Sequence, residues 1–319
     1  MSTAAKIDCL ACGSCTVDIL VRPVDLTSPL HAGKLHRVEP IELTIGGISC
    51  NASITQSRLG LRSGVFSATG DDRWGQIIRE SLQQEQVDCT GLRQFSGVPS
   101  SVSVVAVDDE GGRSFIHSQG APKKLRAADY LGSLDLFASS RYMLIGYYPL
   151  LPGMLDDLPT LFAAIQETGC RTAMDAAGGG GEWEPLRRTL PYLDVYCPSL
   201  DEARQQTGHE DPKKILETFR RATDNTCLGV KLGDQGALLS PADGQFVSID
   251  PVSPPGPVVD TTGAGDAFFA GFLAGLILKM SAEDAGRLAA AAGAQSVVAA
   301  GATTSATTLS ALQSLTTKS

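Results

Sequence analysis

The residues best suited to chemistry lie in one short segment, residues 259–271, which reads VDTTGAGDAFFAG. Two glycines flank a small residue at Gly263-Ala264-Gly265, and a single carboxylate follows at Asp266. The apolar run 267–278 contains no proline and predicts a helix. A glycine-rich turn at the start of a helix directs several backbone N–H groups at one point, where the helix dipole adds partial positive charge. Such a point suits a phosphate group.

A carboxylate at the start of that helix would repel a phosphate, so its presence needs a separate reason. Asp266 makes chemical sense as a general base that removes a proton from the group attacking the phosphate. The simpler alternative is a tight turn that only caps the helix, with Asp266 as a favourable acid in the first turn. The glycines and the acid follow directly on Asp260-Thr261-Thr262, and this combination favours the catalytic interpretation.

The composition is that of a globular protein with a large core. The chain has 319 residues, of which 43% are hydrophobic and 19% charged, which fits one large α/β domain with a small appendage. The net charge is −9 and no basic run is interleaved with aromatic residues, so a nucleic-acid partner is disfavoured. No run of 18 apolar residues or signal-peptide pattern is found, so we expect a cytoplasmic protein without a membrane partner.

The eight cysteines, in a chain without a secretory pattern, indicate free thiols in a reducing compartment. Cys9, Cys12 and Cys15 have a C-x2-C-x2-C spacing that resembles iron–sulfur sites. They lie across an expected strand and the turn after it, and a buried strand does not gather three thiolates around one cluster. We therefore interpret them as buried apolar side chains. The four histidines show no spacing typical of metal ligands.

Two common nucleotide-binding patterns are missing from the sequence. No G-x4-G-K-S/T segment occurs, and the residue three positions after Gly265 is Phe268 where a dinucleotide-binding fingerprint would have glycine. P-loop and dehydrogenase functions are therefore disfavoured.

Strand-like and helix-like runs alternate along most of the chain, which predicts a mainly parallel sheet with helices on both faces. The expected strands are 6–12, 64–69, 141–147, 171–175, 192–197 and 226–232. The expected helices are 51–60, 74–86, 153–168, 200–207, 212–223, 265–279, 281–299 and 307–316.

Residues 16–45 and 100–118 break this alternation, because they contain strand-like runs with no helix between them. These runs are VDILVRPV, LHRVEPIELTI, SVSVVAVD and RSFIHS, and DDEGG is a hairpin-turn signal. We expect them to form a small β-sheet lid over the α/β core, which would comprise 1–15, 46–99 and 119–319. An uncovered small sheet exposes an apolar face and free edges, which makes dimerisation through the lid reasonable.

Segment 259–271 resembles the C-terminal signature of the PfkB (ribokinase-like) family of carbohydrate kinases. Gly46-Gly47 followed by Asn51 resembles the N-terminal signature of that family, and Asp18 resembles an acid that contacts the sugar after the first strand. The resemblance covers nearly the whole chain. It implies a ribokinase-like α/β fold with a lid, ATP-dependent phosphorylation of a small sugar, and a homodimer formed through the lids.

The resemblance also implies which residues bind the acceptor sugar, namely Asp18, Gly46, Gly47 and Asn51. Paired glycines allow a sugar ring to approach the backbone closely. An aspartate and an asparagine together offer the acceptors and donors that vicinal hydroxyls need. Two simpler alternatives stay open: Gly46-Gly47 is a hinge between lid and core, and Asp18 is a solvated acid in a turn.

For the nucleotide and the cations, the resemblance implies three groups of contacts. Ser199 and Glu202 align with an N-x-x-E element, with serine in place of the usual asparagine, and Glu202 would hold Mg²⁺ through water. ATP would lie near Lys231, Gly233 and Gly236, whereas the adenine-proximal position 290 is alanine. A monovalent cation, with K⁺ as the candidate ion, would lie near Asp260, Thr262 and Ser305.

The implied chemistry is direct phosphoryl transfer, in which Asp266 accepts the proton of the sugar hydroxyl and the N–H groups of Gly263, Ala264 and Gly265 stabilise the transferred group. The acceptor stays open, because Tyr147-Tyr148 stand where ribokinase has a glutamate that helps hold the sugar. The two tyrosines could stack on a ring or belong to the core. A nucleoside kinase of the same family is the main alternative, which an aromatic clamp in the lid would support. A non-catalytic sugar- or nucleotide-binding protein is disfavoured by the intact Asp266.

Overall fold

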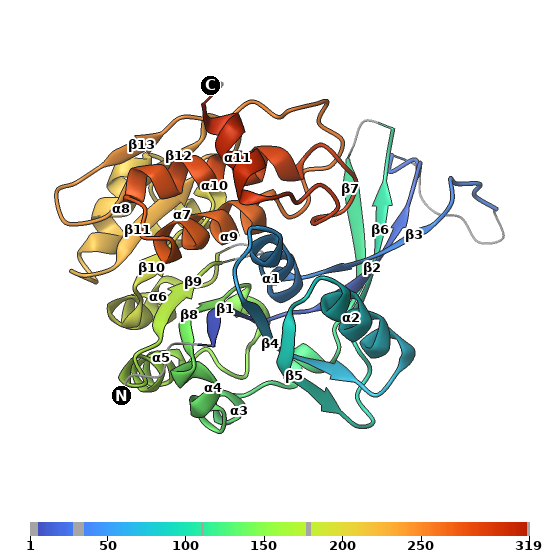
Figure 1. Ribbon diagram of the computed structural model, residues 1–319, viewed down its shortest axis with the longest axis horizontal. Coiled ribbons are helices and arrows are strands. Elements are labelled where there is room, and N and C mark those ends of the chain that lie inside the picture. Colours follow the sequence, from blue (N-terminus) through green and yellow to red (C-terminus); the bar gives the residue numbers. More distant parts are fainter. Residues whose placement is uncertain (1–5, 28–34, 110–111, 177–179, 318–319) are drawn as a thin grey trace.

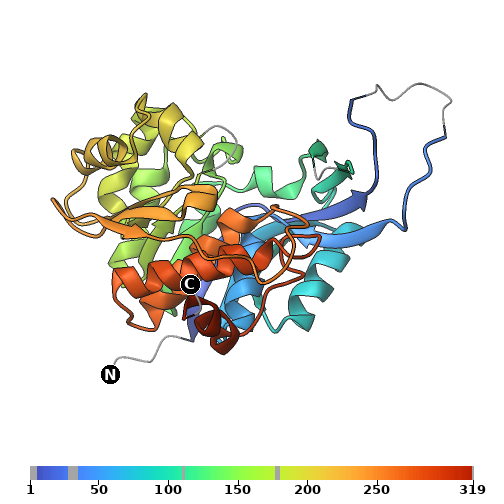
Figure 2. The same ribbon diagram turned by 90° about the horizontal axis from the view of Figure 1, so that it is seen from above.

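The computed structural model describes residues 6–27, 35–109, 112–176 and 180–317. These residues form a large α/β body from one side of which a smaller sheet projects (Figure 1). Residues 22–27, after strand β2 (Thr16–Val21), and residues 35–41, before strand β3 (Glu42–Gly46), extend away from the body (Figure 2). In the described part of the chain, no helix is both long and apolar enough to cross a bilayer.

The large sheet has the strand order β13-β12-β11-β10-β9-β8-β1-β4-β5 within the described residues. The strands from β5 to β11 pair in parallel, and β12 and β13 add an antiparallel edge. Parallel strands end at the same edge of a sheet, so the residues that follow β1, β8, β9 and β11 come together there. The bounds are β1 Ile7–Cys12, β4 Ser63–Gly70, β5 Asp88–Phe95, β8 Ser140–Ile145, β9 Arg171–Met174, β10 Val195–Tyr196, β11 Cys227–Lys231, β12 Ala237–Ser240 and β13 Val247–Ile249.

Helices cover both faces of this sheet, and the alternation along β1 shows why both faces must be apolar. Cys9 and Ala11 pack into the cluster under one layer of helices, whereas Leu10 and Cys12 pack into the cluster under the other. The first layer contains α1 Ile48–Arg58, α2 Arg73–Gln84, α9 Ala264–Ile277, α10 Ala282–Ser296 and α11 Leu309–Thr316. The second contains α3 Ala127–Leu131, α4 Leu134–Ala138, α5 Leu158–Glu167, α6 Trp183–Thr189, α7 Leu200–Thr207 and α8 Pro212–Arg220.

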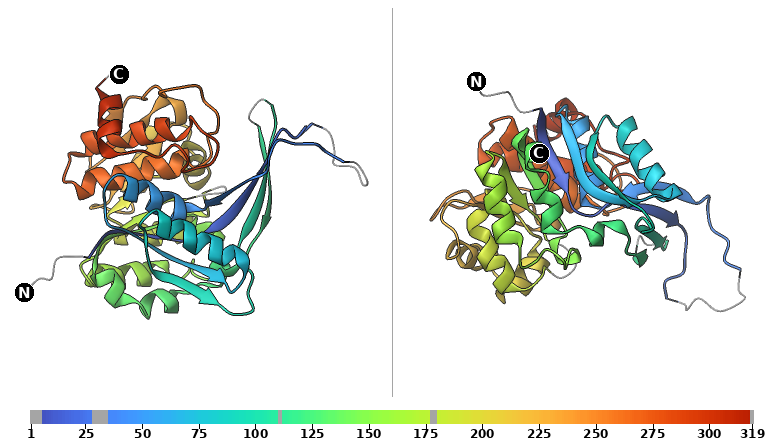
Figure 3. Two further views of the ribbon diagram at one scale, coloured as in Figure 1. Left: turned by 45° about the vertical axis from the view of Figure 1, so that its right-hand side comes forward. Right: turned by 90° about the horizontal axis from the view of Figure 1, so that it is seen from below.

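The small sheet has the order β3-β2-β6-β7, in which β2 and β6 pair in parallel and the outer pairs are antiparallel. Its strands are β2 Thr16–Val21, β3 Glu42–Gly46, β6 Val102–Val107 and β7 Arg113–Ser118. The left view of Figure 3 shows this lid projecting from the body beside α1 and α2. The predicted fold, a mainly parallel sheet with a separate small β-sheet lid, is confirmed.

Several element predictions were wrong in detail. The run 35–45 forms a strand only at β3, because Pro40 has no N–H to donate to a ladder. The helix expected at 153–168 begins at Leu158, after turns at 152–157. Strands β5, β12 and β13 and helices α3, α4 and α6 were not predicted, because they are short or carry no clear apolar period. Two residues of the DDEGG turn, 110 and 111, lie outside the described residues.

Candidate active site

Helix α9 begins with a left-handed glycine that no other residue could replace without strain. Gly263 is the N-cap, with a φ of 75°. A Cβ atom at Gly263 would lie 2.4 Å from the Cβ of Ala302. The N–H of Ala264 donates to the carbonyl of Thr261 at 3.3 Å, whereas no described residue accepts a bond from the N–H of Gly263 or Gly265. Two N–H groups at the positive end of the helix dipole are thus available to an anion.

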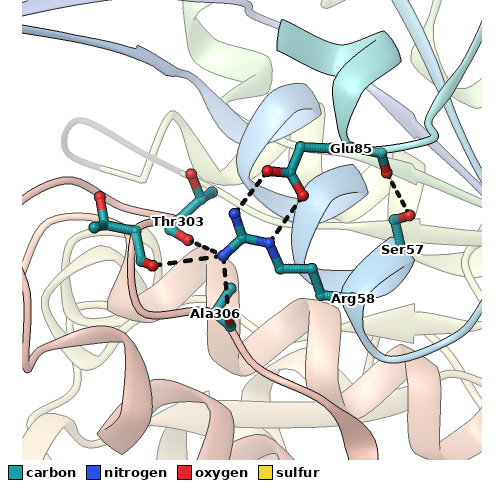
Figure 4. A network of polar contacts seen from close by, with 6 residues as sticks. Ser57, Arg58, Glu85, Thr303 and Ala306 are labelled. Atoms are coloured by element: carbon teal, nitrogen blue, oxygen red, sulfur yellow. Dashed lines mark hydrogen bonds and ion pairs between the residues drawn. The ribbon is translucent and has the colours of Figure 1, made fainter.

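The turn that packs against this cap is held by Arg58, the last residue of α1. Its guanidinium donates two bonds to the carboxylate of Glu85, at 2.9 and 2.7 Å. It also donates to the carbonyls of Thr303 and Ala306, at 2.8 and 2.9 Å (Figure 4). Because Ala302 lies next to this turn, the ion pair at the end of α1 helps to hold the backbone against which α9 is capped.

Asp266 lies in the first turn of α9 and is 3% exposed. Its Oδ2 accepts a bond from Nδ2 of Asn51 at 2.7 Å and from the hydroxyl of Tyr147 at 2.8 Å. Asn51 belongs to α1, and Tyr147 follows β8. Burial raises the pKa of Asp266, while the bonds from Asn51 and Tyr147 and the charge of Lys231 oppose this rise. The carboxylate is therefore a stronger base than an exposed aspartate.

A buried ion pair lies beside the start of α9. The Nζ of Lys231, at the end of β11, is 2.6 Å from Oδ2 of Asp175, which directly follows β9 and is 1% exposed. Burial would lower the pKa of Lys231, but the carboxylates of Asp175 and Glu202 raise it overall, so the lysine stays charged. A Cβ at Gly265 would lie 3.3 Å from this Nζ. An ammonium group thus adjoins the available N–H groups of α9.

A cavity of about 450 Å³ opens at the same place. Its lining includes Lys231 and Gly265 together with the apolar residues Phe268 and Ala290. Gly236, also in the lining, has a φ of 84°, and a Cβ there would lie 2.0 Å from the carbonyl oxygen of Ile249. The lining of the cavity therefore combines one cationic side chain with mostly apolar residues. Its lining comprises Lys231, Gly233, Asp234, Gly236, Pro251, Val252, Ser253, Pro254, Val258, Thr261, Ala264, Gly265, Phe268, Ala290, Gly293, Ala294 and Val297.

In the lid, the side chain of Asp18 on β2 lies against Gly46, the last residue of the neighbouring strand β3. A Cβ at Gly46 would lie 2.1 Å from Oδ2 of Asp18, so only glycine fits there. Gly47 has a φ of 82°, and a Cβ there would lie 2.5 Å from the carbonyl oxygen of Ser14. Burial raises the pKa of Asp18 to about 6, helped by the charge of Asp260. Gly46-Gly47 thus joins lid to core and also makes room for Asp18.

The comparisons with known proteins agree with one another. The family model described as pfkB family carbohydrate kinase matches residues 11–309. The chain belongs to this family. This pfkB-family kinase is 31% identical over 249 residues to a fructokinase from Klebsiella pneumoniae, covering 72% of this chain and 76% of that protein. It is 30% identical over 243 residues to an aminoimidazole riboside kinase from Salmonella typhimurium, covering 72% of each.

The fold of the kinase is also found in solved structures. A candidate ribokinase II from Escherichia coli, in complex with ATP and Mg²⁺, superposes with a TM-score of 0.83 at 22% identity and covers 98% of this chain and 100% of that one. The kinase is accordingly a phosphotransferase with an alcohol group as acceptor.

Two sets of predicted ligand residues already bond within the kinase. Ser199 and Glu202 form a capping box at the start of α7: Ser199 N–H donates to Glu202 Oε2 at 2.7 Å, and Glu202 N–H donates to Ser199 Oγ at 3.4 Å. The carboxylate of Asp260 accepts bonds from the N–H groups of Thr262 and Gly301, each at 2.7 Å. It also pairs with Arg113 from β7 at 2.7 Å, which joins the lid to the core.

The remaining members of the predicted cation site do not form a ligand shell by themselves. Ser305 donates its hydroxyl to the carbonyl of Ser296 at 2.9 Å. No described residue forms a hydrogen bond with the buried hydroxyl oxygen of Thr262. Among the described residues, no group of three or more acidic, histidine or cysteine side chains is arranged to hold a metal.

The three cysteines of the C-x2-C-x2-C run are buried, as the sequence predicted. Cys9, Cys12 and Cys15 are fully buried, and burial raises the pKa of each thiol. His36, His117 and His209 are exposed, and His31 lies outside the described residues.

Two residues of the site were not predicted as site residues from the sequence. Asp175 had one usable signal, because it ends a predicted strand of the parallel sheet. The position of Tyr147 was noticed but its partner was not, since Asp266 lies 119 positions away. Tyr148 points elsewhere and donates to the carbonyl of Gly180 at 2.7 Å. The adjacent tyrosines therefore have different roles, one at the site and one in the core.

Proposed function

We propose that this protein is an ATP-dependent sugar kinase in which Asp266 is the general base. The observation that carries the proposal is a buried carboxylate of raised pKa in the first turn of a helix whose cap leaves two N–H groups available. A carboxylate with higher proton affinity is a better acceptor for the proton of an attacking hydroxyl. The same turn stabilises the charge of the transferred phosphoryl group.

Each residue of the site has a separate role in this mechanism. The carboxylate of Asp266 takes the proton from the acceptor hydroxyl, while the N–H groups of Gly263 and Gly265 bind oxygens of the phosphoryl group. The ammonium of Lys231 lies close enough to Gly265 to add its charge to the same site. Closure of the lid, which Arg113 already connects to Asp260, would exclude water that could otherwise accept the phosphoryl group.

The cavity at the start of α9 suits ATP in both shape and polarity. Lys231 and Gly265 in its lining match a polyphosphate, and the apolar residues Phe268 and Ala290 match a purine held by packing. Mg²⁺ would neutralise charge on the phosphates. One carboxylate oxygen of Glu202 accepts the bond from Ser199, so Glu202 would hold the ion through its other oxygen or through water. The described residues offer no cluster of three or more acidic, histidine or cysteine side chains as direct ligands, so waters and phosphate oxygens would complete the coordination.

The acceptor is proposed to bind between Asp18 and Asn51. The Oδ1 of Asn51 is buried and no described residue donates a hydrogen bond to it, which is costly unless a ligand supplies a donor. Asp18 offers an acceptor-only group when ionised. These features favour a polyhydroxylated acceptor.

A nucleoside acceptor is the second candidate, and one lid residue favours it. Phe115 is 57% exposed and lies between Arg113 and His117 on β7. Side chains two apart share a face of a strand, and Arg113 reaches Asp260 of the core, so Phe115 lies on the lid face directed toward the body. An exposed ring there could stack on a base. The similarity to an aminoimidazole riboside kinase points the same way.

The cation, the dimer and the location extend the proposal. A monovalent cation would use the Thr262 hydroxyl, which no described residue pairs with, and K⁺ is the candidate.

A homodimer would cover the outer face of the lid, where Leu43 and Ile116 are 53% and 61% exposed at the two ends of a cross-strand apolar row. A cytoplasmic location agrees with eight free cysteines.

The decisive experiment is an ADP-release assay with purified protein over pentoses, hexoses including fructose, polyols and nucleosides including aminoimidazole riboside. The proposal expects ADP release with at least one sugar, at a rate about 10²–10⁴ lower in the Asp266→Asn variant. Release with nucleosides alone would replace the first candidate with the second. Silence with every acceptor, combined with binding of sugar or nucleotide in calorimetry, would favour a non-catalytic binding protein.

A further inference from the structure

Tyr147 occupies a conformation that tyrosine rarely adopts. Its φ is 57° and its ψ 35°, in the left-handed region that costs a non-glycine residue free energy. Its ring packs against the cluster under α1, α9 and α10, and its hydroxyl reaches Asp266. Such a strained backbone persists only where the surroundings determine it, and it is enriched at functional sites.

The two donors on Asp266 converge on one of its two oxygens. Both the amide of Asn51 and the hydroxyl of Tyr147 bond to Oδ2. No hydrogen bond from a described residue occupies Oδ1. A carboxylate held at one oxygen from two directions cannot rotate freely, so Oδ1 keeps a fixed direction and remains available to an incoming hydroxyl.

The hydroxyl of Tyr147 acts only as a donor. Burial raises the pKa of Tyr147 well above its usual range, and the neighbouring Asp266 raises it further, so the phenol stays protonated. A protonated donor stabilises the ionised form of the carboxylate that accepts its bond. Burial of Asp266 favours its protonated form, so burial and the bond from Tyr147 shift the pKa of Asp266 in opposite directions.

The geometry points to Tyr147 as a positioning residue that fixes the orientation of the Asp266 carboxylate and stabilises its ionised form. This inference rests on the proposed role of Asp266 as the base. Other charged groups that act on Asp266 are Lys231 at the end of β11, which favours its ionised form, and Glu202 on α7, which disfavours it; Asp175 after β9 adds a further negative charge to this cluster. Tyr147 and Asn51 are the groups that bond to the carboxylate itself.

The test variant is Tyr147→Phe, which removes only the hydroxyl. Tyr148→Phe is the matched control, because its hydroxyl bonds to Gly180 and Gln206 and not to Asp266. The pKa of Asp266 is measured without substrate by ¹³C NMR of the aspartate carboxyls, with Asp266→Asn to assign the resonance. We expect Tyr147→Phe to raise this pKa and Tyr148→Phe to leave it in place. Equal pKa values in the wild type and Tyr147→Phe would overturn the inference.

Kinetics supply a second readout on the active acceptor. The acid limb of kcat/KM against pH should move to higher pH in Tyr147→Phe, because the base loses a donor to its ionised form. The value of kcat should fall by about 10-fold, as expected for one lost bond to a charged group. A fall in kcat with an unmoved acid limb would reduce Tyr147 to a structural residue and overturn the inference.

A third variant covers the case in which Tyr147→Phe does not fold. Incorporation of 3-fluorotyrosine at position 147 keeps the shape and makes the phenol a stronger donor, so the pKa of Asp266 should fall. An unchanged pKa would count against the inference. These NMR results do not depend on catalysis: if no acceptor were phosphorylated but the pKa moved as expected, the proposed function would fail while the contact with Asp266 would stand.

Discussion

Replacement of Asp266 by asparagine separates its role as a base from any role in folding. The variant keeps the size of the side chain, and its single amide oxygen can still accept from Asn51 and Tyr147. It places an NH₂ group where Oδ1 was available, so the acceptor hydroxyl meets a donor in place of a base. The N–H groups of the α9 turn and the Lys231 ammonium are unchanged, so part of the rate enhancement remains.

The expected loss of rate is the contribution of the general base alone, because the N–H groups of the α9 turn and the Lys231 ammonium are retained. Positioned general bases contribute about 10²–10⁴ in rate, which corresponds to about 2.7–5.4 kcal/mol. We expect kcat to fall within that range, with ATP affinity nearly unchanged in calorimetry, because Asp266 is not part of the lining of the 450 Å³ cavity. The assay is steady-state ADP release at saturating acceptor. A variant that keeps more than about a tenth of wild-type turnover would refute the assignment.

Stability gives an independent check whose sign follows from the pKa. The folded pKa of Asp266 is raised, so its contribution to stability is fully present below the unfolded pKa and is lost as pH rises through the folded pKa. At pH 8 the Asp266→Asn variant should therefore melt at or above the wild-type temperature, and this advantage should shrink in acid. Asp201→Asn, at a residue with a 92% exposed side chain, is the matched control. A lower melting temperature at pH 8 for Asp266→Asn alone would mean that the carboxylate is structural.

Five further outcomes test other parts of the site. Asp18→Ala should weaken sugar binding by about 1–3 kcal/mol without moving ATP affinity; loss of ATP binding with normal sugar KM would reverse the two assignments. Asn51→Ala should weaken sugar binding similarly and also lower kcat, because it bonds to Asp266 as well. The pKa of Asp18 near 6 predicts that sugar binding weakens as pH falls through 6, and a flat profile in calorimetry would contradict it. Lys231→Met should lower the free energy of unfolding in urea by about 3–5 kcal/mol, because it leaves Asp175 unpaired. Activity should fall in a potassium-free buffer, and full activity there would remove the cation from the mechanism.

Much of the fold was predictable because its signals are local. Glycine at position 263 is required by one positive φ angle at the start of α9. The capping box at the start of α7 involves only Ser199 and Glu202, three positions apart. The two runs without helices correctly predicted the lid. Strands β12 and β13 were missed because four- and three-residue strands leave no readable alternation.

By itself, the sequence determined the family, the parallel core with its lid, and the α9 turn that carries Asp266, since each follows from residue types at short spacing. Only the tertiary structure decided what surrounds that carboxylate. The partners Asn51 and Tyr147, the pair of Lys231 with Asp175, and the raised pKa of Asp266 all join segments that are distant along the chain. Hydrogen bonds and desolvation depend on distances in space, and these are set by packing at the carboxyl edge of the sheet.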